Sequence, residues 1–344
     1  MSITRTTSIL AGLILFVATS LFAQTGSTIG GDQNSGRSQV FQILTEAASP
    51  RAAALGNSFV SIKDDPSTIF TNPAALSTQQ RRDSAAPGSL LSFGFTKLAL
   101  DMNNGYVAYS QPTANILGDS GWMGIGVVYR DYGTFQGADN VGAPTQEFSA
   151  SDVALSLAYS NTIADQPLRY GIAVKYVSST LVSGSYSASG VAADLGLLYE
   201  SQPLLLTIGL SALNIGTELS NYSGVSEPLP FNLQLGISKK LERLPLTLHL
   251  SFRNLTRDRE GRNLFYALND FAIGGEFTVS KVIRLRFGYE NQKRRDLKTP
   301  EGLGLGGFSF GLGMVFRKLH FDYSLSAMGP ALADVHRFGG AYIF

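Results

Sequence analysis

From Leu90 onward, apolar residues alternate with polar or small residues at a period of two. One such segment reads IRLRFGYE from Ile283 to Glu290, and another reads LHFDYSLS from Leu319 to Ser326. Successive side chains of a β-strand point to opposite faces, so each segment predicts a strand with one apolar face and one polar or small face.

About fourteen segments of this kind follow one another along the chain. The weakest is the second, because GYVAY is apolar on both faces. No segment between them has the periodicity of a helix. The predicted strands begin near Ser89, Asn104, Gly121, Gln146, Leu168, Ala188, Leu204, Leu229, Leu246, Phe271, Val282, Gly307, Leu319 and Val335.

The connections between these segments alternate in length. Every second one is short, as in ESQP, LERLP, TVSK and FRKL, whereas the others are long and polar, as in NIGTELSNYSGVSEP and NQKRRDLKTPEGLGL. Transmembrane β-barrels sort their connections in this way, with short periplasmic turns and long outer loops. Closure also removes the exposed edges of so many apolar strands. The sequence therefore predicts an all-β, antiparallel transmembrane barrel of about fourteen strands, over residues 88–344.

Both ends of the chain agree with an outer-membrane location. The last segment, RFGGAYIF, ends on Phe344 and resembles the aromatic signal that barrel-assembly machinery recognises. At the other end, Arg5 precedes an apolar run from Ile9 to Ala23, which predicts a signal peptide over residues 1–23 with cleavage after Ala23. The alternative, a membrane-spanning helix, needs about 20 apolar residues.

Composition narrows the chemistry. The chain has no cysteine, which excludes disulfide scaffolds and thiol catalysis. Its net charge of +1 gives no overall attraction for nucleic acid. His249, His320 and His336 have no ligand-like spacing, so neither a metal nor another cofactor is expected.

Residues 24–87 precede the first strand and differ in character from the rest. A barrel of fourteen strands is wider than its own side chains fill, because filling is reached at about eight strands. We therefore expect this segment to include a lumenal hatch that plugs the barrel from the periplasmic side. Alanines that allow close helix packing open the hatch; they are Ala47, Ala48, Ala52, Ala53 and Ala54.

The rest of the hatch predicts short elements. Asn57–Ile62 is expected to form one strand. Asp64-Asp65-Pro66 predicts a turn and a helix start, and Asn72-Pro73-Ala74 ends that helix. We expect Asp64 and Asp65 to pair with lumenal arginines such as Arg284 and Arg286.

Two stretches resemble a known family. PRAAALGNSFVSIKDDPSTIFTNPAAL, from Pro50, resembles the N-terminal hatch of FadL-type outer-membrane barrels, and its alanine-rich start is closer to the PorV/PorQ branch. FGYENQKRRDLKTPEGLGLGGFSFGLG, from Phe287 to Gly313, is most like PorQ, as is the overall length. The likeness extends over the whole mature chain.

The resemblance implies a role in the type IX secretion system rather than catalysis. PorV-like proteins receive cargo at the outer membrane, and PorQ-like proteins anchor a surface partner, PorZ, in the attachment complex. The expected function is thus a non-enzymatic component that docks a surface protein or secreted cargo, in contact with outer-membrane lipid. The alternative is a FadL-like transporter of hydrophobic compounds, which would need an apolar lumenal pocket.

The sequence offers one candidate contact surface and no convincing catalytic group. Ser-His-Asp sets arise only by free choice among many serines, and His320 with Asp322 favours a lumenal ion pair. A predicted outer loop carries four cations, Lys293, Arg294, Arg295 and Lys298. It is either a solvated loop or a contact for an acidic partner or for lipid phosphates, which arginine pairs with well.

Overall fold

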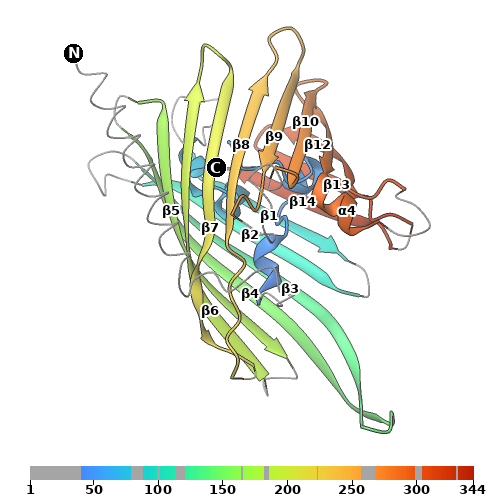
Figure 1. Cartoon of the computed structure of the whole chain (residues 1–344). Coiled ribbons are helices and arrows are strands. Elements are labelled where there is room, and N and C mark those ends of the chain that lie inside the picture. Colours follow the sequence, from blue (N-terminus) through green and yellow to red (C-terminus); the bar gives the residue numbers. More distant parts are fainter. Residues whose placement is uncertain are drawn as a thin grey trace.

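In the computed structural model, fourteen antiparallel strands form one closed barrel (Figure 1). The structure describes residues 40–78, 88–98, 101–113, 121–163, 166–181, 186–222, 224–256, 268–298, 304–330 and 332–344. Each strand pairs with its neighbours in the chain, and β1 pairs with β14 to close the ring. The strands are β1 (Leu90–Lys97), β2 (Asn103–Thr113), β3 (Gly121–Ala138), β4 (Pro144–Thr162), β5 (Leu168–Leu181), β6 (Tyr186–Ser201), β7 (Leu206–Ser220), β8 (Asn232–Lys240), β9 (Leu246–Phe252), β10 (Phe271–Thr278), β11 (Ile283–Glu290), β12 (Phe308–Phe316), β13 (Leu319–Ser326) and β14 (Val335–Ile343).

The predicted fold class is confirmed. Every observed strand begins within three residues of its predicted start, and the weakest prediction corresponds to β2. The signal peptide predicted over residues 1–23 lies outside the described residues, as do residues 24–39 and 79–87. None of the helices in the described ranges reaches the length and apolarity that a membrane-spanning helix requires.

The two faces of the wall follow the period-two pattern. Leu285 and Phe287 on β11 are exposed on the outer face, opposite Leu312 and Phe310 of β12. Arg286, between them in the chain, is buried on the inner face. This distribution, with apolar side chains outside and polar side chains inside, is typical of barrels whose outer face contacts lipid.

The wall is much taller on one side than on the other (Figure 1). β3 and β4 extend from Gly121 to Ala138 and from Pro144 to Thr162, whereas β9 covers only Leu246–Phe252. Pairing of β3 with β2 stops at Asp131, so the far part of the β3–β4 hairpin pairs only within itself. The hairpin therefore projects beyond the barrel at the end that carries the long connections, which is called the long-loop end below.

Residues 40–78 pack inside the ring of strands. They contain η1 (Gln42–Thr45), α2 (Pro50–Ala54), η2 (Pro66–Phe70) and η3 (Pro73–Thr78). α2 contacts β11 to β14, whereas η3 contacts β3 to β6 on the other side of the ring. Apolar side chains of this inner segment, such as Ile69 and Leu76, are buried against small apolar residues on the inner face of the wall. That the inner segment closes the lumen to solutes, as the hatch hypothesis holds, stays a prediction.

Local signals set the ends of these elements. Asp65 caps η2, its carboxylate accepting a hydrogen bond from Ser67 N at 2.9 Å, and Pro66 occupies the first turn. η2 ends before Asn72-Pro73, as predicted. The strand predicted over Asn57–Ile62 is wrong, because this stretch forms turns. Its backbone bonds locally, as from Ile62 N to Phe59 O at 3.1 Å, and Asn57 adopts a left-handed φ of 63°.

Inward-facing glycines let the inner segment approach the wall. A Cβ at Gly288 would lie 2.1 Å from Gly56 N, and one at Gly171 would lie 2.3 Å from Ala74 N. Both distances are too short for any side chain. The small residues on the inner face of the strands are therefore contact positions for residues 40–78, at which backbone packs against backbone.

Candidate functional site

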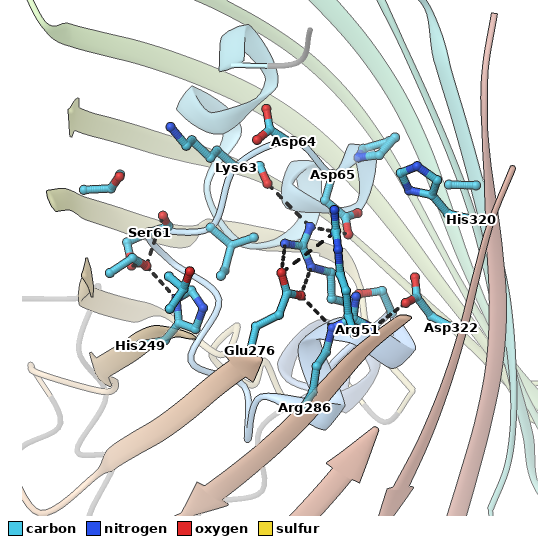
Figure 2. A pocket seen from close by; sticks show the side chains of 18 of the residues that line it. Arg51, Ser61, Lys63, Asp64, Asp65, His249, Glu276, Arg286, His320 and Asp322 are labelled. Atoms are coloured by element: carbon cyan, nitrogen blue, oxygen red, sulfur yellow. Dashed lines mark hydrogen bonds and ion pairs between the residues drawn. The ribbon is translucent and has the colours of Figure 1, made fainter. Parts of the chain in front are cut away.

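A network of ion pairs joins the inner segment to the barrel wall (Figure 2). Arg51 of α2 donates to Glu276 of β10, with Nε–Oε2 at 3.2 Å and Nη2–Oε1 at 3.4 Å. Arg286 of β11 also donates to Glu276, with Nε–Oε2 at 2.6 Å, and pairs with Asp322 of β13. The four side chains are buried or nearly so, and buried charges are stable only when paired in this way.

The predicted hatch carboxylates lie beside this network, but their pairing differs from the prediction. Asp65 lies 3.5 Å from Arg51 Nη1 and not against a wall arginine. Arg284 and Arg286 both pair with Glu276. Within this network the inner segment thus contributes an arginine, which the sequence analysis missed. Elsewhere, Lys63 of the same segment pairs with Glu200 of β6, and Glu46 pairs with Arg130 of β3. Asp64 is exposed toward the cavity described next, where partial loss of water contact raises the pKa of its carboxyl, while Lys63 and Arg51 oppose the rise.

The network borders a cavity of about 580 Å³. The cavity opens among residues of the short-turn end, such as Leu205, Lys240 and Thr247, and its lining carries charges of both signs. A space with this lining suits water and ions and disfavours an apolar ligand, because an apolar ligand would strip water from the charges.

Asn72 fixes the second half of the inner segment. Its side chain is completely buried and donates from Nδ2 to Val60 O at 2.8 Å and to Leu197 O of β6 at 3.2 Å. Its Oδ1 accepts from Ala74 N at 3.1 Å. The Asn72-Pro73-Ala74 motif therefore ties three pieces of backbone together, and Ser160 of β4 adds a bond to Ala74 O at 3.0 Å.

A chain of hydroxyl groups ends on a histidine in the same cavity. Ser61 Oγ lies 2.6 Å from Ser238 Oγ, which lies 2.7 Å from His249 Nδ1. His249 Nε2 has no hydrogen-bond partner among the described residues. A catalytic triad needs a carboxylate that orients the far nitrogen of the ring. That bond is missing from this set, which instead joins the inner segment to β8 and β9.

The described residues contain no group of three His, Asp or Glu side chains arranged to hold a metal ion.

A second buried ion pair lies elsewhere in the wall, between Lys175 Nζ and Asp194 Oδ2 at 2.6 Å. Lys175 also donates to Asn214 Oδ1 at 2.9 Å, and Asn214 N donates to Asp194 Oδ1 at 2.8 Å. These bonds lie at a register shift between β6 and β7, which they hold together, so we assign them a structural role.

The four cations of the predicted outer contact lie on or beside α4 (Asn291–Asp296), a helix that the sequence analysis did not predict. Arg295 pairs with Asp270, and Arg294 Nη1 donates to Gly306 O at 3.0 Å. Burial lowers the pKa of Lys293, and neighbouring Arg337 lowers it further. Lys298, just past the helix, is exposed. Three of the four cations thus have neighbours within the protein, and their role toward a partner stays a prediction.

A groove of about 480 Å³ lies at the long-loop end. It is formed by the first residues of the inner segment, by the outer parts of β3, β4 and β5, and by the connection after β7. Phe135 and Phe148 stack beside it with ring centroids 5.4 Å apart. The sequence analysis missed this groove, because its walls come from five separate stretches of chain.

Comparison with solved structures places this architecture among outer-membrane barrels. The toluene transporter TodX of Pseudomonas putida matches with a TM-score of 0.58 and 12% identity, over 89% of this chain and 99% of TodX. A Pseudomonas aeruginosa FadL homologue matches with a TM-score of 0.50 and 12% identity, over 86% of this chain and 98% of the homologue. No family model and no curated protein matches the chain.

The closed barrel and these likenesses support a location in the outer membrane. More particularly, the chain has the fold of FadL-type barrels, among which TodX is a toluene transporter. At 12% identity, the likeness concerns the fold alone.

Replacing Arg51 by methionine is expected to loosen the inner segment. The change removes the hydrogen bonds to Glu276 and leaves Asp65 without this cation, at a cost of about 1.5–3 kcal/mol. We expect the ionic conductance of the purified protein in planar bilayers to rise. Lys97→Met is the matched control, because Lys97 is exposed and its pair with Asp101 is at the surface. Equal conductance of wild type and Arg51→Met would contradict the idea that this network holds the segment.

Proposed function

We propose that this chain is a non-enzymatic outer-membrane component of a type IX secretion system, which docks a surface partner or secreted cargo at its long-loop end. The observation that carries the proposal is that the barrel interior holds a packed segment and a charged cavity. Residues 40–78 pack against strands on both sides of the ring, and the remaining cavity is lined by paired charges such as Arg51 and Glu276. An interior of this kind suits a platform better than a conduit for apolar molecules.

The sequence resemblance supports the choice of system. Residues 50–76 resemble the hatch of the PorV/PorQ branch, and residues 287–313 are most like PorQ. The partner that this resemblance implies is a PorZ-like surface protein, with secreted cargo as a further possibility.

The shape of the barrel supports docking. Short turns face the periplasm and long loops face outward in outer-membrane barrels, so the projecting β3–β4 hairpin would stand on the cell surface (Figure 1). Loops held on a rigid scaffold are the usual location of binding residues. The tall part of the wall would give a partner a hydrogen-bonded strand surface beyond the headgroups.

A second candidate function is transport of hydrophobic compounds. It is favoured by the fold of TodX, a toluene transporter, and by the aromatic groove beside Phe135 and Phe148. Against it stands the charged cavity at the short-turn end, which an apolar solute leaving the groove would have to cross.

Deleting the gene in the native host is expected to release surface-held protein into the medium while other barrels remain in the outer membrane. A docking component predicts that cargo moves from the membrane fraction to the medium, and that the wild-type gene restores retention. Proteomics of the two fractions measures this, and affinity purification of the tagged chain identifies the partner. Normal retention together with slower growth on an apolar carbon source such as toluene would instead establish the transporter.

A further inference from the structure

The groove at the long-loop end combines aromatic walls with carboxylates. Phe41, Tyr132 and Tyr222 line it together with Phe135 and Phe148. Flat aromatic faces attract organic cations, because the ring face carries partial negative charge. The groove is therefore suited to a side chain that is both apolar and cationic.

Two carboxylates also line the groove, and a third lies beside it. Asp152 is buried and accepts hydrogen bonds from Tyr132 Oη at 2.8 Å and from Ser179 Oγ. Glu227 lines the groove, and its backbone N donates to Glu218 Oε2 at 2.9 Å, which brings two acidic residues together. None of these three carboxylates forms an ion pair with another described residue.

The negative charge of these carboxylates acts on the neighbouring side chain of Tyr222. Burial raises the pKa of the Tyr222 hydroxyl, and the nearby carboxylates of Asp152 and Glu227 raise it further. These carboxylates therefore disfavour a further negative charge at this position, and their attraction for a positive charge offsets part of the cost of burying one there.

Counter-charges are scarce in the chain around the groove. The sequence has no Lys or Arg between Arg130 and Arg169, and none between Lys175 and Lys239. Arg130 lies opposite Asp152 in the register; its Nη2 lies 2.7 Å from Glu46 Oε2, and its guanidinium carbon lies 5.7 Å from the centroid of the Tyr132 ring. The tall wall is therefore acidic beyond the barrel, and its charge is complementary to a basic partner.

We propose that this groove binds a lysine or arginine side chain, flanked by an apolar residue, from a basic segment of the docked protein. The aromatic rings hold the apolar part and the face of the cation, and Glu227 with Asp152 supplies the opposite charge. This inference rests on the proposed docking function, and it assigns the contact to the acidic wall rather than to the cationic helix α4.

The test uses the purified full-length barrel in detergent and a fluorescein-labelled hexapeptide that alternates phenylalanine and lysine. Its reference is the same peptide with acetylated lysines, which keeps the apolar groups and removes the charge. Fluorescence polarisation is expected to show binding of the lysine peptide about tenfold tighter than of the acetylated one. Equal affinity for the two peptides would overturn the proposal.

Variants locate the binding. Glu227→Gln and Phe135→Ala are each expected to weaken the lysine peptide by roughly three- to tenfold. Glu147→Gln is the matched control, because Glu147 is exposed on β4 of the same wall and does not line the groove. Equal losses for Glu147→Gln and Glu227→Gln would overturn the site in favour of a diffuse acidic field. A loss confined to Phe135→Ala would mean an apolar occupant.

A competing outcome is that the groove binds a cation of this same chain, since Arg37 lies three residues before Val40 in the sequence. Arg37→Gln is expected to leave peptide affinity unchanged, whereas a gain in affinity would assign the groove to Arg37. The experiment is separable from the test of function. Lost retention on gene deletion with no peptide binding would refute the groove only, and peptide binding with normal retention would refute the docking function.

Discussion

Replacing Leu285 by arginine is expected to prevent most of the protein from assembling in the outer membrane. Leu285 lies on the outer face of β11 and is 47% exposed, in the position where lipid covers it. Arginine on the lipid face costs about 2–4 kcal/mol near the bilayer midplane. The measurement is heat-modifiable gel mobility of the membrane fraction, in which folded barrels migrate differently from unfolded chains.

Thr247→Arg is the matched control. Thr247 lies on β9 and lines the charged cavity, where an added guanidinium faces Glu276 across the strand pair. Gly288 and Ser251 also face inward, but Gly288 has no room for a side chain against Gly56. A Thr247→Arg barrel that assembles less well than Leu285→Arg would show that the assignment of faces is wrong by one residue.

Replacing Asn72 by aspartate is expected to release the inner segment from the wall. The aspartate keeps an acceptor for Ala74 N but turns a second oxygen toward the carbonyls of Val60 and Leu197. Two hydrogen bonds become repulsive contacts and a buried charge is left uncompensated, at about 3–5 kcal/mol. We expect rapid proteolysis within residues 40–78 and a lower unfolding temperature.

Asn140→Asp controls for the introduced charge, because Asn140 is exposed at the tip of the β3–β4 hairpin. It is expected to leave both measurements unchanged. An Asn72→Asp protein that resists protease as well as wild type would mean that these hydrogen bonds do not hold the segment.

Secondary structure was predictable because its causes are local. The alternation in IRLRFGYE and LHFDYSLS decides which side chains meet lipid, whatever the neighbouring strands are. Asp65-Pro66 begins η2 for an equally local reason, since the carboxylate bonds to Ser67 N two residues on. Asn57–Ile62 shows the limit, because its apolar residues are buried by packing against the wall and not by strand pairing.

The partners of the charged groups were not predictable. Asp65 and Arg286 belong to the same region, yet Arg51 lies between them and pairs with Glu276, more than two hundred residues away in the chain. The helix α4 was not predictable either, because the connection in which it lies shows no helical periodicity in the sequence. The residue that pairs with its Arg295, Asp270, comes from outside the helix.

The sequence by itself determined the class of this protein: a barrel of about fourteen strands, its lipid-facing side chains, its sorted connections and an inner segment of short elements. Each of these depends on spacing along the chain, which the sequence states directly. Only the tertiary structure decided the ion-pair network around Glu276, the height of the wall at β3 and β4, and the acidic aromatic groove beside Tyr222. These depend on which distant residues closure of the ring brings within a few ångströms, and no local pattern encodes that.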